Sequence, residues 1–89
     1  MTRDKLDHVA DALRSAADST EDQATRDRLQ TQAEQFENMA SADRGPDHGR
    51  LARHEHVLRE IKQQDASVTA DIDRGLEAIS GYRETLEGV

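Results

Sequence analysis

The fold class is decided by residues 51–86, which read LARHEHVLREIKQQDASVTADIDRGLEAISGYRETL. Mostly apolar residues recur in this stretch with the alternating spacing of three and four that is typical of one face of an α-helix. The positions that share this face are Leu51, His54, Leu58, Ile61, Asp65, Val68, Ile72, Gly75, Ile79, Tyr82 and Leu86. The pattern predicts an all-α protein.

The same helical phase is compatible with two structures. The first is a single helix of roughly 57 Å at 1.5 Å per residue, whose far half would need a second chain to cover it. The second has a break at 63–67. Asp65 favours the break, because an ionised carboxylate is costly in a core but accepts free amide protons at a helix N-terminus. We therefore expect helices over 48–63 and 67–86, with the single long helix as the alternative.

The first half of the chain predicts two further helices, over 3–18 and 21–42. Their apolar positions lie on different helical phases, so the chain must turn near Ser19. Thr20 and Gln23 match a capping box, in which the threonine hydroxyl accepts an orphan amide proton and the glutamine reaches back. The sequence therefore predicts that Thr20 begins the second helix.

The stretch DRGPDHG, residues 43–49, separates the two halves of the chain. Gly45 suits a left-handed residue at a helix C-terminus, Pro46 prevents the helix from continuing, and Asp47 can cap the next helix. Four helices joined by three short connections alternate in direction. We expect a single domain over 1–89 that folds as an up-down four-helix bundle.

The charge of the chain is strongly acidic. Nineteen carboxylates oppose 12 basic side chains among 89 residues, which gives a formal net charge of −7, and Lys5 and Lys62 are the only lysines. In molar salt the Debye length falls to about 3 Å, so that repulsion within such a chain is screened. The carboxylates are scattered along the chain, which favours solvation of the whole protein over docking of a basic partner. The composition predicts adaptation to high salt.

The absence of cysteine excludes a disulfide framework, a thiolate nucleophile, an iron–sulfur cluster and cysteine-ligated zinc. No apolar run approaches the 18 or so residues of a membrane span, and the N-terminus has no apolar signal region. We expect no membrane association and a cytoplasmic location. The motifs of serine hydrolases, zinc proteases and phosphate-binding loops are also absent from the sequence, so we expect no enzyme and no cofactor.

Residues 43–62 form a basic island. This segment carries +1 before its histidines are counted, whereas the segments on either side each carry −4. Its candidate contacts to a partner or a nucleic acid are Arg44, Arg50, Arg53, His56 and Arg59. Glu55 and Glu60 interrupt the island, no aromatic residue lies within it, and the net charge repels a polyanion. Nucleic-acid binding is therefore the alternative function. The purely structural interpretation is that the arginines pair with the acidic surface of the flanking helices or of a second subunit.

The histidines offer weak support for a metal site. His54 and His56 point about 200° apart on a helix and cannot bind one ion, whereas His48 and His54 could come together if the loop allows it. A metal-binding bundle through His48 and His54 is the second alternative. We predict no metal ligands for the leading interpretation.

The small set of large apolar residues favours association. A bundle with so few of them is marginally stable alone, and a second copy or a protein partner would supply further apolar cover. The candidate interface residues are Leu29, Phe36, Met39, Val57 and Leu76. The leading interpretation is a non-enzymatic association module or homodimer.

Two stretches resemble a known family. DRGPDHGRLARH at 43–54 and YRETLEGV at 82–89 are similar to a group of short acidic proteins of halophilic archaea, described as a family of unknown function. The resemblance agrees with the expected adaptation to high salt. It implies no catalytic or binding residue.

Overall fold

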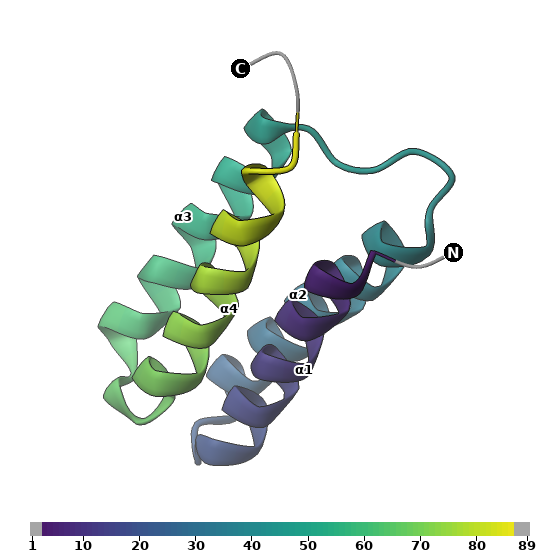
Figure 1. Ribbon diagram of the computed structural model, residues 1–89. Coiled ribbons are helices and arrows are strands. Elements are labelled where there is room, and N and C mark those ends of the chain that lie inside the picture. The colour runs from purple at the N-terminus through teal and green to yellow at the C-terminus, as the bar shows by residue number, and fades with distance from the viewer. Residues whose placement is uncertain (1–2, 87–89) are drawn as a thin grey trace.

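The computed structural model describes residues 3–86 and consists of helices and their connections (Figure 1). The elements in chain order are α1 (Asp4–Ser19), α2 (Gln23–Ser41), α3 (His48–Gln64), the single 3-10 turn η1 (Ala66–Val68) and α4 (Thr69–Arg83). The predicted all-α class is confirmed. The fourth helix ends at Arg83, three residues before the expected end at 86.

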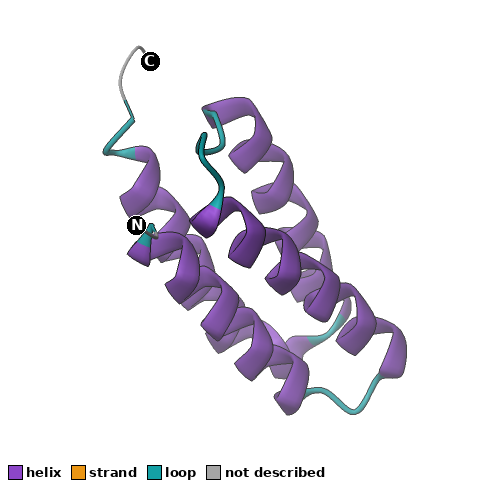
Figure 2. Ribbon diagram, turned by 90° about the vertical axis from the view of Figure 1, so that its right-hand side faces the viewer, coloured by secondary structure: helices purple, strands orange, loops and turns teal. Residues whose placement is uncertain are grey.

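The four helices form an up-down bundle (Figures 1 and 2). Helix α1 packs closely against both α2 and α4, and α3 packs against α4 and η1. The ring of Phe36 on α2 contacts the ring of His54 on α3, with centroids 4.9 Å apart, so α3 also lies beside α2. Helices α1 and α3 are therefore diagonal to each other.

Asp65 separates α3 from α4, as its place on the apolar face predicts. Its backbone amide donates to the carbonyl of Ile61 at 3.0 Å, which ends α3. Its side chain then accepts from the amide of Ser67 at 3.0 Å and from the hydroxyl of Ser67 at 2.6 Å. These bonds, with one from the hydroxyl of Thr20, lower the pKa of Asp65 below its ordinary 3.8 because they favour the ionised form. The alternative of one long helix is wrong.

The prediction that Thr20 caps the second helix is wrong. Asp22 is the cap, because its carboxylate accepts from the amide of Thr25 at 2.9 Å, and α2 begins at Gln23. The buried hydroxyl of Thr20 instead accepts from the amide of Asp22 and donates to the carboxylate of Asp65. Thr20 thus connects the α1–α2 turn to the α3–η1 turn at one end of the bundle.

The sequence predicts Gly45 as the left-handed residue at the C-terminus of α2, and this prediction is wrong. The helix ends at Ser41, and Ala42 after it is extended, with φ −70° and ψ 151°. A Cβ atom at Gly45 would lie 2.7 Å from both Nε of Arg3 and the hydroxyl of Tyr82. A side chain at position 45 would therefore oblige Arg3 and Tyr82 to shift, so the close passage of the α2–α3 loop favours glycine here.

Arg3 closes the end of α2. Its guanidinium Nη1 donates to the carbonyls of Ala42 at 2.6 Å and Met39 at 3.2 Å, and its backbone amide donates to Ala40 at 2.9 Å. The last turn of α2 has no basic residue of its own. Arg3 supplies both hydrogen-bond donors and a positive charge where the helix dipole is negative.

Asp47 caps α3 as predicted, accepting from the amide of Arg50 at 2.8 Å.

Candidate functional site

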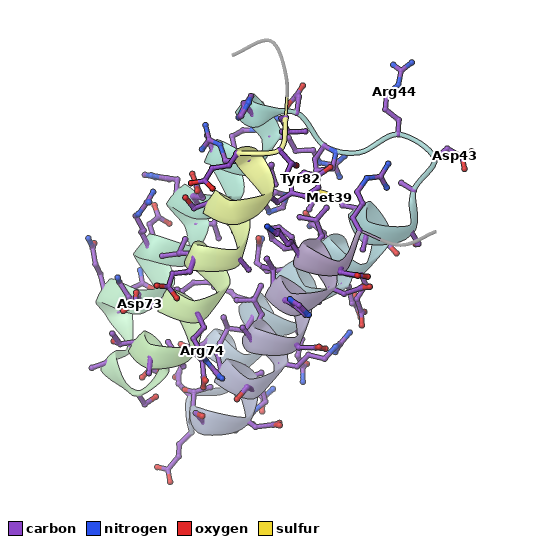
Figure 3. The ribbon with its side chains drawn as sticks, viewed as in Figure 1. Met39, Asp43, Arg44, Asp73, Arg74 and Tyr82 are labelled. Carbon is purple, nitrogen blue, oxygen red and sulfur yellow. The ribbon has the colours of Figure 1, made fainter. Side chains whose placement is uncertain are left out.

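The structure corrects the candidate apolar interface. Leu29, Phe36 and Met39 are between 0% and 2% exposed and belong to the core, because α2 turns its apolar face inward between α1 and α3. Met39 belongs to the same buried core cluster as Tyr82, and Figure 3 labels both residues. These residues cannot form a docking surface on the folded chain.

The other two candidates, Val57 and Leu76, are partly buried and pack against the core. Val57 lines a groove of about 380 Å³ beside α2 residues such as Thr31 and Gln32, and Leu76 is not part of that groove. Val57 and Leu76 therefore do not combine into one exposed apolar face.

The basic island forms an ordered feature on α3. Arg50, Arg53, His56 and Arg59 follow one another at intervals of three residues, so they are neighbours in one oblique row along the helix surface. All four are exposed. The row rises roughly 14 Å along the helix axis, at 1.5 Å per residue. We call these four residues the arginine row.

Arg44 lies outside the row, on the loop that precedes α3. It is exposed and projects away from the bundle (Figure 3). The structure therefore brings four of the five predicted basic contacts onto one helix and leaves the fifth on the adjoining loop.

Within residues 3–86, no side chain forms a hydrogen bond or ion pair with the guanidinium groups of the row or of Arg44. Arginines on other helices are paired. Arg14 contacts Glu37 at 2.5 Å, and Arg83 contacts Glu55 at 2.7 Å. Pairing with the acids of the flanking helices, one form of the structural interpretation, therefore does not hold for the four arginines of the island.

Two carboxylates were expected to interrupt the island. Glu55 does not, because it is only 8% exposed and turns toward α4, where it accepts from Nη1 of Arg83. Glu60 does lie beside the row, where its Oε1 is 3.5 Å from Nη2 of Arg28 and its Oε2 is 3.3 Å from Nε2 of His56. The arginine row is thus more continuous than the sequence indicates.

His54 lies just beneath the row, and the charges of two row arginines affect its pKa. It is 8% exposed, and its Nδ1 lies 2.6 Å from Oε1 of Gln32. Burial is the first cause that lowers the pKa of His54 below its ordinary 6.5, and the charges of Arg50 and Arg53 add to it. Because Gln32 presents its oxygen, the neutral ring donates from Nδ1 in this arrangement.

The structure does not bring His48 and His54 together as metal ligands. Nδ1 of His48 accepts from Nε of Arg83 at 3.1 Å, while His54 is bound to Gln32. No group of three histidine or carboxylate side chains in the described part of the chain could hold a metal ion. Nε2 of His48 is buried without a hydrogen-bond partner among these same residues.

A second groove, which sequence reasoning missed, lies between α1 and α4. It has a volume of about 560 Å³, and both small residues and charges of both signs line it. Its lining includes Lys5, Asp11, Ala12, Arg74 and Ala78. Because the charges alternate, the groove does not have a charge of one sign that would select a ligand.

These observations define the class of the protein as a small four-helix bundle that presents three exposed arginines on one helix, Arg50, Arg53 and Arg59, with no side-chain partner among residues 3–86. The profile of DUF7553, a family of unknown function, matches residues 1–85, and the chain belongs to this family. The expectation of a family of unknown function is therefore confirmed, and its halophilic archaeal source stays a prediction. The family match ends at residue 85, so it covers only the first part of the resembling stretch at 82–89. Residues 87–89 of that stretch lie outside the described residues.

No match was found among curated proteins or among solved structures. Across residues 3–86, the structure contains no helix that combines the length and the apolar character needed to cross a membrane.

Proposed function

We propose that the chain is a non-enzymatic association module and that its arginine row binds an acidic surface of a protein partner. One observation carries the proposal. Arg50, Arg53 and Arg59 are exposed and have no partner within the described residues, although the chain has 19 carboxylates against 12 basic side chains. A guanidinium group matches a carboxylate with two parallel hydrogen bonds, so the row is suited to acidic side chains.

The properties of the surface favour a protein over a nucleic acid. A formal charge of −7 repels a polyanion at long range. Single-stranded nucleic acids bind to exposed aromatic rings, whereas Phe36 is 0% exposed and Tyr82 is 9% exposed in this chain. The same long-range repulsion acts on an acidic protein, so it is the burial of both aromatic rings that favours a protein partner, because contact with carboxylates requires no stacking.

High salt is compatible with this mode of binding. The acidic composition supports a salt-rich cell as the setting, of the kind found in halophilic archaea. In molar salt, with a Debye length of about 3 Å, the repulsion between two acidic proteins is screened at long range. Guanidinium and carboxylate groups in direct contact still attract each other. The row therefore acts at contact distance under these conditions.

The proposal is tested with a fluorescent glutamate-rich peptide and a mixed-sequence DNA duplex, each titrated with the protein. The test variant is Arg53→Gln/Arg59→Gln. The control is Arg14→Gln/Arg74→Gln, which changes the net charge equally but removes arginines that already pair with Glu37 and Asp71. We expect the peptide to bind, the test variant to lose up to about 25-fold in affinity, and the control to bind as the wild type does.

Two outcomes contradict the proposal. Equal peptide binding by the wild type and the test variant would show that the row is not the binding surface. Tighter binding of the duplex than of the peptide, with loss in the test variant, would assign the row to nucleic acid.

A further inference from the structure

We infer that the groove between α2 and α3 docks a helical segment of an acidic partner protein, with an apolar side chain over Val57 and carboxylates on Arg50 and Arg53. The inference rests on the proposed function, because it names the kind of segment that the arginine row receives. Arg50 and Arg53 form the end of the row that lies beside this groove.

Arg50, Arg53 and Val57 lie on one straight face of α3. At 100° per residue, Arg53 is about 40° and Arg50 about 20° from Val57 around the helix. They precede Val57 by about 6 Å and about 10 Å along the helix axis. Arg59, by contrast, is about 160° from Val57 and lies on the opposite side of the helix. The face therefore combines one apolar side chain with two guanidinium groups.

This face lies on the side of α3 that is next to α2. Val57 lines the groove together with Gln32 of α2, whose Oε1 is 2.6 Å from Nδ1 of His54. Burial lowers the pKa of His54, and the charges of Arg50 and Arg53 lower it further. Both guanidinium groups are therefore close to the part of α3 that contacts α2.

The acids of α2 at this level turn away from α3. Glu37 accepts from Nε of Arg14 on α1 at 3.3 Å. This pairing raises the pKa of Arg14, and the charge of Glu34 adds to the rise, so both acids lie toward α1. Gln35 is about 160° from Glu37 around the helix and therefore lies toward α3, where it offers only an amide. This arrangement leaves the two arginines of the groove without an acid from α2.

The other end of the groove is closed by contacts between the two helices. Nη2 of Arg28 lies 3.5 Å from Oε1 of Glu60, and Nη1 of Arg28 donates to Oε1 of Gln64 at 3.2 Å. Asp27 also lines this end. A polyanion that ran along the groove would meet the carboxylates of Asp27 and Glu60. The charges therefore favour a protein segment whose own carboxylates lie at one end only.

A helix has the spacing that this face requires. A leucine and two glutamates four and seven residues away from it lie on one side of a helix, with the same separations as Val57, Arg53 and Arg50. Each exposed ion pair contributes up to about five-fold in affinity, and each buried methylene group about four-fold. The contact is therefore a transient one.

The test titrates the protein with fluorescent, alanine-based helical peptides. The matched peptide has a leucine and glutamates four and seven residues from it, and it is made in both chain directions. The shifted peptide has the same composition, but its glutamates are two and five residues from the leucine, on the opposite face. We expect the matched peptide to bind up to about 25-fold more tightly in one direction. Replacing its leucine by alanine should weaken binding by at least about four-fold.

Protein variants locate the contact. Arg50→Gln/Arg53→Gln should lose the preference for the matched peptide. Val57→Thr, which keeps the shape of the side chain, should reduce the effect of the leucine. The control is Arg14→Gln/Arg74→Gln, which removes the same charge at arginines that already have acidic partners and should bind as the wild type does.

The pKa of His54 gives a second readout that needs no variant. Carboxylates on Arg50 and Arg53 offset two of the charges that lower this pKa, so it should rise when the matched peptide is bound. The imidazole resonances of His54, followed against pH with and without the peptide, measure the change.

Equal binding of the matched and shifted peptides in both directions, or an unchanged pKa of His54 in the complex, overturns the inference. If the glutamate-rich peptide still binds and loses affinity in Arg53→Gln/Arg59→Gln, the proposed function stands and only the groove is wrong. If no acidic peptide binds, the proposed function fails as well.

Discussion

Replacement of Arg3 by alanine should destabilise the bundle, although Arg3 precedes the first helix. Its guanidinium group donates to the carbonyls of Met39, Ala40, Ala42 and Asp43 at distances from 2.6 to 3.4 Å. The variant would remove the guanidinium donors from these carbonyls and the positive charge from the negative end of the helix dipole. The backbone amide of residue 3 would still donate to Ala40.

The expected loss follows from these contacts. Hydrogen bonds to a charged group contribute about 1.5–3 kcal/mol when shielded, and the interaction of a charge with a helix end contributes about 0.3–1 kcal/mol. Two of the four carbonyl contacts are exposed, which reduces their share. We expect Arg3→Ala to lower the free energy of unfolding by about 1–2 kcal/mol, or the Tm by about 4–16 °C for a domain of this size.

Thermal unfolding followed by circular dichroism measures this loss. The matched control is Arg50→Ala, which removes an exposed arginine without a partner in the described chain and should change stability by less than about 0.5 kcal/mol. Arg3→Lys, which keeps the charge but has fewer donors, should fall between the two. An Arg3→Ala variant as stable as Arg50→Ala would refute the capping role.

Two further predictions concern the interior. Gly75→Ala should raise the free energy of unfolding by about 0.5–1 kcal/mol, because its Cβ would lie 3.6 Å from Leu13 in ordinary contact. Gly45→Ala should lower it by about 1 kcal/mol, since Arg3 would have to move. Urea unfolding of both variants compares the two changes, and changes of the same sign would contradict the prediction. The lowered pKa of His54 means that the unfolded chain binds a proton more readily, so stability should be full above pH 6.5 and fall as the pH drops below it. This loss should become smaller in His54→Gln, and an unchanged pH profile of the Tm would show that His54 does not cause it.

The sequence is a good guide wherever one residue determines a local feature. The helical phase identifies the buried faces, and Asp47 and Asp65 identify two helix starts, because a capping carboxylate acts on amides within three residues of it. The choice between Thr20 and Asp22 could not be made in this way. Both can cap a helix, and the contact of Thr20 with Asp65 across the bundle decides between them.

Features that depend on distant segments were beyond sequence reasoning. Arg3 caps a helix that ends 38 residues later, and the preference for glycine at 45 follows from the approach of Arg3 and Tyr82 to the loop. The same limit applies to the site. The spacing of Arg53 and Arg59 places them on the outer face of α3, but their lack of a partner follows only from the positions of all the other helices. The inward turn of Glu55 likewise depends on Arg83 of α4.

The central claim is that the arginine row binds an acidic protein surface. Titration of ¹⁵N-labelled protein with the glutamate-rich peptide, followed by the amide resonances, tests it most directly. The account predicts that the largest shifts fall on residues 49–60 of α3 and that they disappear in Arg53→Gln/Arg59→Gln. Shifts centred on the groove between α1 and α4, or none on α3, would contradict it.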